Sequence, residues 1–227
     1  MNKGLCCAQA VAWPFLLLPI LIAGTLPQSA SPVRIIEDFS DAEAGEFPRD
    51  FRTYPFQRKK AQKVYAIQKE GENLFLSASD REEISVQVFR KFYWPTDRYP
   101  TFSWRWRVRD LPRSADERNP NLNDIACGVY VVFGGYGGRV LKYVWSSTLP
   151  EGLIIPKKED KFFMFIKAHG PSEGWRPVSV NIVQDYRQVF NEDPKKMPIG
   201  FGILTDGNAT HSPASCDYDD FVVSKGL

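Results

Sequence analysis

From Ser31 onward the chain alternates between short apolar runs and turns rich in Pro, Gly and charged residues. Apolar runs of roughly four to eight residues bounded by such turns are typical of β-strands. The pattern therefore predicts an all-β fold: a two-sheet antiparallel β-sandwich in which residues 31–227 form a single domain. The predicted strands are residues 33–39, 64–70, 73–78, 84–92, 101–110, 124–133, 140–146, 162–168, 177–183, 199–204 and 218–223.

The clearest strand is residues 101–110, where apolar and polar side chains alternate without interruption. Because successive side chains of a strand point to opposite faces, one face is apolar and the other carries arginines. We interpret the apolar face, which includes Trp104 and Trp106, as core; the alternative is a surface on which sugars stack. The arginines are interpreted as a solvated face or as partners of acidic side chains on a neighbouring strand. They are Arg105, Arg107 and Arg109.

One segment departs from the strand pattern. In residues 183–191 the period changes from two to that of a helix, with Val183, Tyr186 and Phe190 on one face. Asn191 is expected to end this helix. The sequence therefore predicts one short helix near 183–191.

The first 30 residues form a segment of their own. Lys3 is their only charge, and an apolar run extends from Ala8 to Leu26. These are the features of a secretory signal peptide, so we expect residues 1–30 to be removed on export. The mature chain is then periplasmic or secreted and has no membrane span. The alternative is an uncleaved anchor, which Pro14 and Pro19 disfavour.

Charge narrows the class of partner. The whole chain has a formal net charge of +2, and without residues 1–30, which contain Lys3 alone, it is +1. Proteins that bind nucleic acid need a basic surface to displace counterions from phosphates, so we expect no nucleic-acid partner. Aromatic residues make up 14% of the chain and supply side chains that can stack on a ligand. Charge and composition leave the oligomeric state open.

Two cysteines remain after removal of the signal segment, Cys127 and Cys216. They can form a disulfide in an oxidising compartment. Cys127 lies in a predicted core strand, where a free thiol is an equally ordinary small apolar side chain. The sequence leaves both states open.

The densest set of oxygen-bearing side chains lies between the last two predicted strands. Asp206, Asn208 and Thr210 are followed by an acidic group that ends with Asp220. Carboxylate and amide oxygens are the ligands that Ca²⁺ prefers, so Asp206 and Asn208 are candidates for a structural calcium site. The alternative is a turn whose side chains bond their own backbone. No other cofactor is expected.

Three further candidates come from neighbouring strands. In residues 124–133, one face carries small residues between Asp124 and Tyr130, which leaves room for a ligand or for close packing of the sheets. The next strand places Tyr143 and Trp145 on a single face. We therefore add Asp124, Tyr130, Tyr143 and Trp145 to Asp206, Asn208, Thr210 and Asp220 as candidate ligand-binding residues.

Several of these fragments in this order resemble a family of exported bacterial proteins known as domain of unknown function 3047. The fragments are Asp124 to Phe133, Tyr143 to Trp145, Asn181 to Tyr186, Gly200 to Asp206 with Thr210, and Tyr218 with Asp220. The resemblance implies a jelly-roll β-sandwich, similar to galactose-binding and concanavalin-like domains, in a bacterial envelope. It implies no activity. This chain departs from the family pattern at Cys127, Gly128, Cys216 and Asp219.

We therefore expect a non-catalytic, exported β-sandwich that binds a glycan or another envelope component. One alternative is a polysaccharide hydrolase or lyase, which needs two carboxylates facing each other across a groove. The pairs available for this are Asp206 with Asp220, or Asp124 with either. The other alternative is an envelope protein-interaction module.

Overall fold

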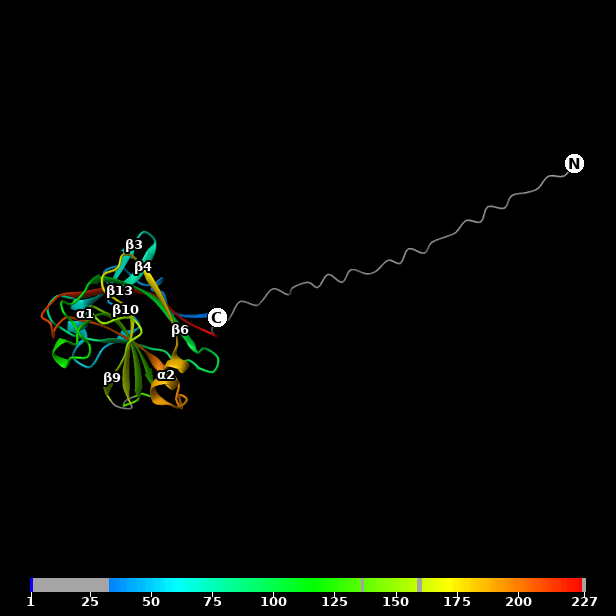
Figure 1. The fold of residues 1–227 in the computed structure, drawn as a ribbon. Coiled ribbons are helices and arrows are strands. Elements are labelled where there is room, and N and C mark those ends of the chain that lie inside the picture. The colour runs from blue at the N-terminus through cyan, green and yellow to red at the C-terminus, as the bar shows by residue number, and fades with distance from the viewer. Residues whose placement is uncertain (2–32, 136, 159–160, 226–227) are drawn as a thin grey trace. The chain divides into compact units, whose positions relative to one another are not determined.

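The protein is described by a computed structural model that covers Met1 and residues 33–135, 137–158 and 161–225 (Figure 1). All described helices and strands belong to the compact unit Ser31–Leu227. The predicted signal peptide lies, Met1 apart, outside the described residues. Within the described ranges, no helix is long and apolar enough to cross a membrane.

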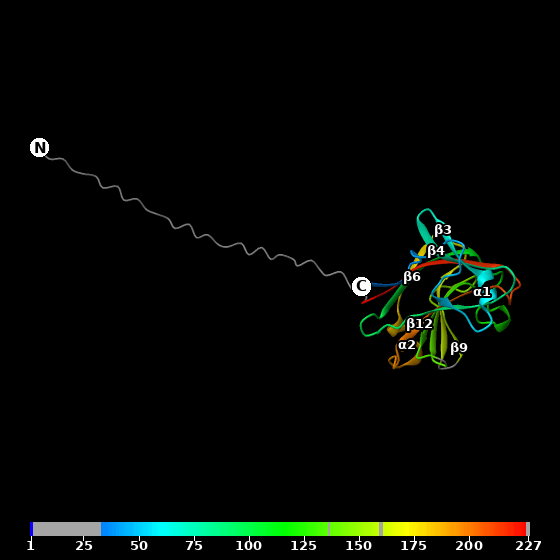
Figure 2. The same cartoon turned by 180° about the vertical axis from the view of Figure 1, so that it is seen from behind.

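The described strands form two sheets, which Figure 1 and, from behind, Figure 2 show as a sandwich. Sheet A runs in the order β11 (Arg176–Asn181), β6 (Thr101–Asp110), β13 (Ala214–Ser224), β4 (Asn73–Asp80) and β3 (Tyr65–Glu70), and β1 (Val33–Glu37) also pairs with β13. Sheet B runs in the order β2 (Phe51–Arg52), β5 (Val88–Lys91), β12 (Pro198–Asp206), β7 (Ile125–Phe133), β8 (Arg139–Ser146), β10 (Phe162–His169) and β9 (Ile154–Lys158). The all-β two-sheet prediction is confirmed.

One pair of strands departs from the antiparallel prediction, because β10 runs parallel to β8. After β8 the chain crosses to the sheet edge, where it forms β9, a strand that the sequence pattern did not predict. The chain then turns back and inserts β10 between β8 and β9. A strand that returns after such a crossover runs parallel to the strand before it.

The described residues also form helices. The predicted short helix is observed as α2 (Ile182–Phe190). Asn181 accepts hydrogen bonds from the backbone N–H groups of Val183 and Gln184, and Asn191 ends the helix with φ of 53°. Helix α1 (Arg58–Val64) and the 3₁₀ turn η1 (Pro120–Leu122) were not predicted.

The core lies between the two sheets. Trp104 and Trp106 of β6 are buried there, which confirms the core interpretation. Their ring centroids lie 5.6 Å from that of Tyr143 and 5.9 Å from that of Trp145, respectively, both on β8. Rings in contact at such distances attract each other beyond the effect of burial alone.

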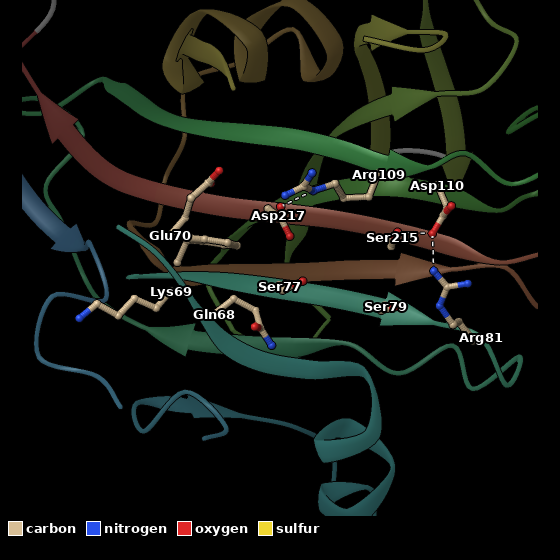
Figure 3. A pocket seen from close by; sticks show the side chains of 11 residues that line it. Gln68, Lys69, Glu70, Ser77, Ser79, Arg81, Arg109, Asp110, Ser215 and Asp217 are labelled. Atoms are coloured by element: carbon tan, nitrogen blue, oxygen red, sulfur yellow. Dashed lines mark hydrogen bonds and ion pairs between the residues drawn. The ribbon is translucent and has the colours of Figure 1, made fainter. Parts of the chain in front are cut away.

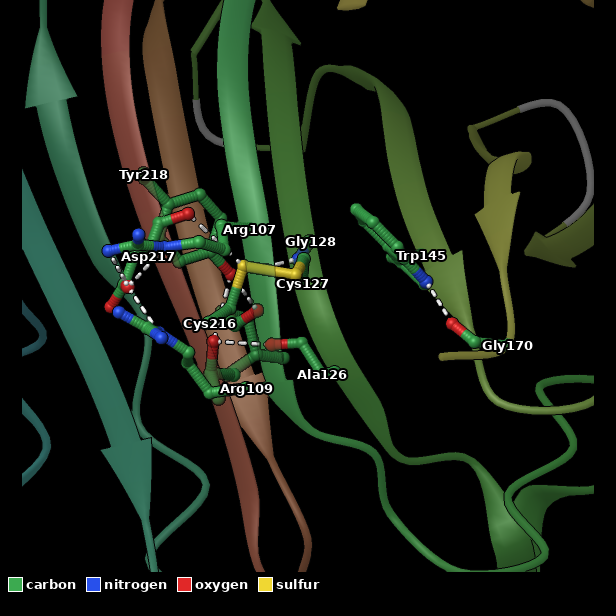
Figure 4. Close-up of a disulfide and its surroundings, with 12 residues drawn as sticks. Arg107, Arg109, Ala126, Cys127, Gly128, Trp145, Gly170, Cys216, Asp217 and Tyr218 are labelled. Carbon is green, nitrogen blue, oxygen red and sulfur yellow. Dashed lines mark hydrogen bonds and ion pairs between the residues drawn. A yellow bond between two sulfur atoms is a disulfide. The ribbon is translucent and has the colours of Figure 1, made fainter. Parts of the chain in front are cut away.

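A disulfide links the sheets through this core. Cys127 of β7 and Cys216 of β13 are fully buried and covalently joined, with their Cα atoms 5.4 Å apart (Figure 4). The bond closes a sequence separation of 89 residues. It therefore fixes one strand of each sheet against the other.

The polar face of β6 pairs with acids on β13. Arg107 donates to the buried carboxylate of Asp217 at 3.0 Å through Nε, and Arg109 donates to the same oxygen at 2.7 Å (Figure 4). Arg105 makes ion pairs with Asp219 at 2.6 Å and Asp220 at 2.8 Å. Of the two interpretations of these arginines, cross-strand pairing with acidic side chains is confirmed.

A second, smaller apolar cluster covers part of the outer face of sheet B. It forms where the chain between β8 and β9 folds back over the sheet. Its buried members are Ile125, Val144, Leu149, Ile155, Met164 and Ile166. The remainder of this face is open, and it contains the groove described below.

Candidate functional site

The stretch from Thr205 to Thr210 contains the last two residues of β12 and part of the turn that leads to β13. The fully buried Asp124 accepts hydrogen bonds from Ala209 N at 3.0 Å and from Thr210 N and Oγ1, both at 2.6 Å. A side chain at Gly207 would lie 1.8 Å from the carbonyl oxygen of Ser212, so only glycine fits there. Asp124 and Thr210 are thus engaged with each other inside the protein.

Asp206 lies in a buried set of charges beneath the outer face of sheet B. Its two carboxylate oxygens accept from Ser85 Oγ at 3.0 Å and from Ile125 N at 3.2 Å. Burial raises the pKa of Asp206 to about 6, although the attraction of Lys142 opposes the shift. Burial likewise lowers the pKa of Lys142 to about 8, although the nearby Asp206 and Glu117 oppose this.

The replacement Asp206→Asn is expected to flatten the pH dependence of stability between about pH 4 and pH 6. A carboxyl whose folded-state pKa is raised binds its proton more tightly in the folded state. Its contribution to the free energy of unfolding is therefore present at low pH and is lost as the pH rises through about 6. The loss is roughly 3 kcal/mol. Urea unfolding of both proteins from pH 3.5 to 7.5 measures it. Parallel curves over that interval would contradict the assignment.

The other candidate residues occupy different parts of the fold. Tyr143 and Trp145 are fully buried and donate to Asp185 Oδ2 at 2.9 Å and to the carbonyl oxygen of Gly170 at 2.8 Å. Their side chains therefore present no surface to a ligand. Asn208 is exposed, and Asp220 is exposed on sheet A.

The predicted calcium ligands do not converge. Asp206 is buried while Asn208 is exposed. Across the described residues, no group of three or more His, Cys, Asp or Glu side chains is arranged to hold a metal ion. The structure therefore adds no support to a calcium site at this turn.

A groove of about 590 Å³ lies on the open part of the outer face of sheet B. Tyr130 of β7 and Phe162 of β10 line it, with ring centroids 6.3 Å apart. Phe89 of β5 and Tyr54, in the turn after β2, line it as well. Four aromatic rings from separate segments therefore line one hollow, and Tyr130 is the only one of them among the predicted site residues.

Small residues beside these rings leave space for a ligand to reach them. Gly202 of β12 lies between Phe89 and Tyr130, and a Cβ there would lie 3.4 Å from the Tyr130 ring and 3.5 Å from the Phe89 ring. Gly135, Gly137 and Gly138, from the turn between β7 and β8, line the groove too. A larger side chain at Gly202 would fill the space between the two rings.

Two polar side chains in the groove, Tyr130 and Gln87, are free to bond a ligand, whereas Thr53 and Arg52 donate to backbone carbonyl oxygens. The hydroxyl of Tyr130 and the side-chain amide of Gln87 have no hydrogen-bond partner in the part of the chain that the structure describes. Burial raises the pKa of Tyr130 well above its ordinary value, so this hydroxyl stays protonated and can donate. The ammonium of Lys142 lies 4.7 Å from the centroid of the Tyr130 ring, an attractive cation–π distance. The described residues that line the groove include no Asp or Glu.

The sequence matches a known protein family. The family described as "Protein of unknown function (DUF3047)" matches residues 49–222. No curated relative matches the sequence.

Solved structures that resemble the chain include two carbohydrate-binding modules. A family 29 module complexed with cellulohexaose is 8% identical, with a TM-score of 0.38 over 86% of this chain and 92% of that one. A family 61 module in complex with β-1,4-galactotriose is 11% identical, with a TM-score of 0.39 over 82% of this chain and 93% of that one. Because both TM-scores are below 0.5, the function must be argued from this chain's own side chains.

Proposed function

Since the chain belongs to DUF3047, a family of proteins of unknown function, we propose a function from the groove itself: a non-catalytic protein that binds a glycan chain on the outer face of sheet B. The observation that carries this proposal is the set of four aromatic side chains that line one open groove: Tyr54, Phe89, Tyr130 and Phe162. The signal-like residues 1–30 support a location outside the cytoplasm, where envelope glycans are available.

Aromatic rings suit sugars for a physical reason. A pyranose ring presents C–H groups on its faces and hydroxyls around its edge. The faces pack on an aromatic ring, and the hydroxyls need hydrogen-bond partners at the rim. Tyr130 and Gln87 supply such partners next to the rings.

The lack of carboxylates among the described lining residues favours glycan binding over acid–base catalysis. A glycosidase of the common type needs two carboxylates beside the scissile bond. No carboxylate lies among the described lining residues, and of the pairs considered from sequence, Asp206 is on sheet B while Asp220 is on sheet A. The hollow shape of the groove also favours a ligand site over a protein-docking surface, which is typically flat.

The replacement Tyr54→Ala is expected to weaken glycan binding at least tenfold while leaving stability unchanged. Tyr54 is 59% exposed, so the core does not depend on it, but it lines the groove. A tenfold loss corresponds to about 1.4 kcal/mol, which is within the range of one stacked ring. A glycan array and pull-down on purified peptidoglycan sacculi identify the ligand, and calorimetry then compares the two proteins.

Tyr93→Ala is the matched control, since Tyr93 is 51% exposed and lies outside the groove. It is expected to bind as the wild type does. Equal losses in Tyr54→Ala and Tyr93→Ala, or no glycan binding by correctly folded wild-type chain, would contradict the proposal.

A further inference from the structure

A second hollow lies on the outer face of sheet A, the face that points away from the groove (Figure 3). It measures about 420 Å³ and is polar. We call it the serine trough. Its lining residues are Gln68, Lys69, Glu70, Phe75, Ser77, Ser79, Arg81, Arg109, Asp110, Ser215 and Asp217.

The trough arises from the order of side-chain sizes across the sheet. In the pairing of β4 with β13, Ser79 faces Ser215 and Ser77 faces Asp217. These short side chains form a floor. Longer side chains on both sides form the walls, including Gln68 on β3 and Arg109 on β6 (Figure 3).

Some of the side chains that line the trough are held by contacts within the protein. Arg109 donates to Asp217 at 2.7 Å, and Arg81 donates to Asp110 at 2.8 Å. Ser215 also donates to Asp110, at 2.7 Å. A ligand that enters the trough therefore meets Arg109, Asp110 and Asp217 already paired within the protein, and it avoids part of the entropic cost of ordering them.

Other groups of the trough are unused, two on its floor and one on its wall. The hydroxyls of Ser77 and Ser79 and the amide of Gln68 have no hydrogen-bond partner anywhere in the described ranges. Each hydroxyl can donate one hydrogen bond and accept two, and the amide can do both as well. Three side chains thus offer donors and acceptors to one ligand.

The charges that line the trough balance. Lys69, Arg81 and Arg109 stand against Glu70, Asp110 and Asp217, and ion pairs engage five of the six. An ionic ligand of either sign would meet like charges among them. A neutral ligand with many hydroxyls meets donors and acceptors in turn.

We propose that the serine trough is a second carbohydrate site, which takes a neutral oligosaccharide by hydrogen bonds to its hydroxyls. It differs from the groove on sheet B, which lies on the other side of the sandwich and offers ring stacking. With both sites occupied, one chain of this protein bridges two glycan strands.

The test uses calorimetric titration of the full chain with four neutral hexasaccharides: β-1,4-glucan, α-1,4-glucan, β-1,4-mannan and β-1,4-galactan. The double variant Ser77→Val/Ser79→Val removes both free hydroxyls and fills the floor. Valine is favoured in strands, so the variant is expected to fold, which thermal unfolding checks. If it does not fold, Ser77→Ala/Ser79→Ala replaces it. Ser179→Val is the matched control, an exposed serine on β11 outside the trough.

At least one hexasaccharide is expected to bind, at least tenfold more weakly to the double variant and equally well to Ser179→Val. Binding lost in Tyr54→Ala but retained in the double variant would overturn the trough and leave the groove standing. Binding lost in the double variant but retained in Tyr54→Ala supports the trough independently of the groove. A folded wild-type chain that binds none of the four overturns the trough.

Discussion

Removing the disulfide is expected to lower the free energy of unfolding by about 4 kcal/mol, because the bond restricts an unfolded chain segment of 89 residues. Cys127 and Cys216 lie at the centre of the core, one on each sheet, so the bond also aligns β7 against β13. The variant is Cys127→Ala/Cys216→Ala, compared in a background in which Cys6 and Cys7 are already alanine. Guanidinium unfolding with and without reductant gives the difference.

Reductant provides the internal control. It should destabilise the chain that retains Cys127 and Cys216 by a similar amount and leave the double variant unchanged, because only the former has a bond to reduce. The buried sulfurs are protected in the folded state, so reduction is expected to follow unfolding. A parent chain whose stability is the same in both conditions would contradict a native disulfide.

Asp217→Ala is expected to cost about 3 to 5 kcal/mol, because it leaves the buried guanidinium of Arg107 without its buried carboxylate. The Asp217 side chain is 3% exposed and that of Arg107 is 9% exposed. Arg107 lies 2.9 Å from Asp217 through one nitrogen and 2.9 Å from the exposed Glu70 through another, so Glu70 alone remains after the change. Urea unfolding at pH 7 measures the loss.

Asp220→Ala is the matched control on the same strand. Its carboxylate pairs with Arg105 at 2.8 Å but is 54% exposed, and exposed pairs contribute about 1 kcal/mol or less. Adding Arg107→Met to Asp217→Ala should recover part of the stability, because the uncompensated charge is then removed. Equal effects of Asp217→Ala and Asp220→Ala would show that burial of the pair contributes nothing.

The strands and their faces could be predicted from sequence because they depend on local alternation. The pattern of residues 101–110 placed Trp104 and Trp106 in the core and the arginines opposite, and both placements are observed. The sequence predicts the start of α2 within a residue because a change of period and a terminating Asn coincide. Local chemistry was sufficient for these elements.

Features that depend on which strands become neighbours could not be predicted. The parallel pairing of β10 with β8 follows from the crossover through β9. No local sequence pattern marks that crossover. The disulfide depends on β7 and β13 facing each other across the core. Asp124 and Thr210 were selected as ligand residues, yet they meet each other because the start of β7 lies beside the end of β12.

The aromatic groove also depends on which strands become neighbours. Tyr130 was selected from the small residues beside it, but Tyr54, Phe89 and Phe162 were not, because each lies on a different segment and has no shared motif with the others. Only the strand order β5-β12-β7-β8-β10 brings them to one face. The alternation of each strand does show which side chains point outward, but the order of the strands is a tertiary property.

The most direct test of glycan binding in the groove is an NMR titration of the ¹⁵N-labelled full chain with the glycan ranked first on the array. The amides of residues that line the groove, including Phe89, Tyr130 and Phe162, are predicted to shift in a saturable manner, and those shifts should be lost in Tyr54→Ala. A glycan that binds while every groove amide stays unchanged would contradict the proposal.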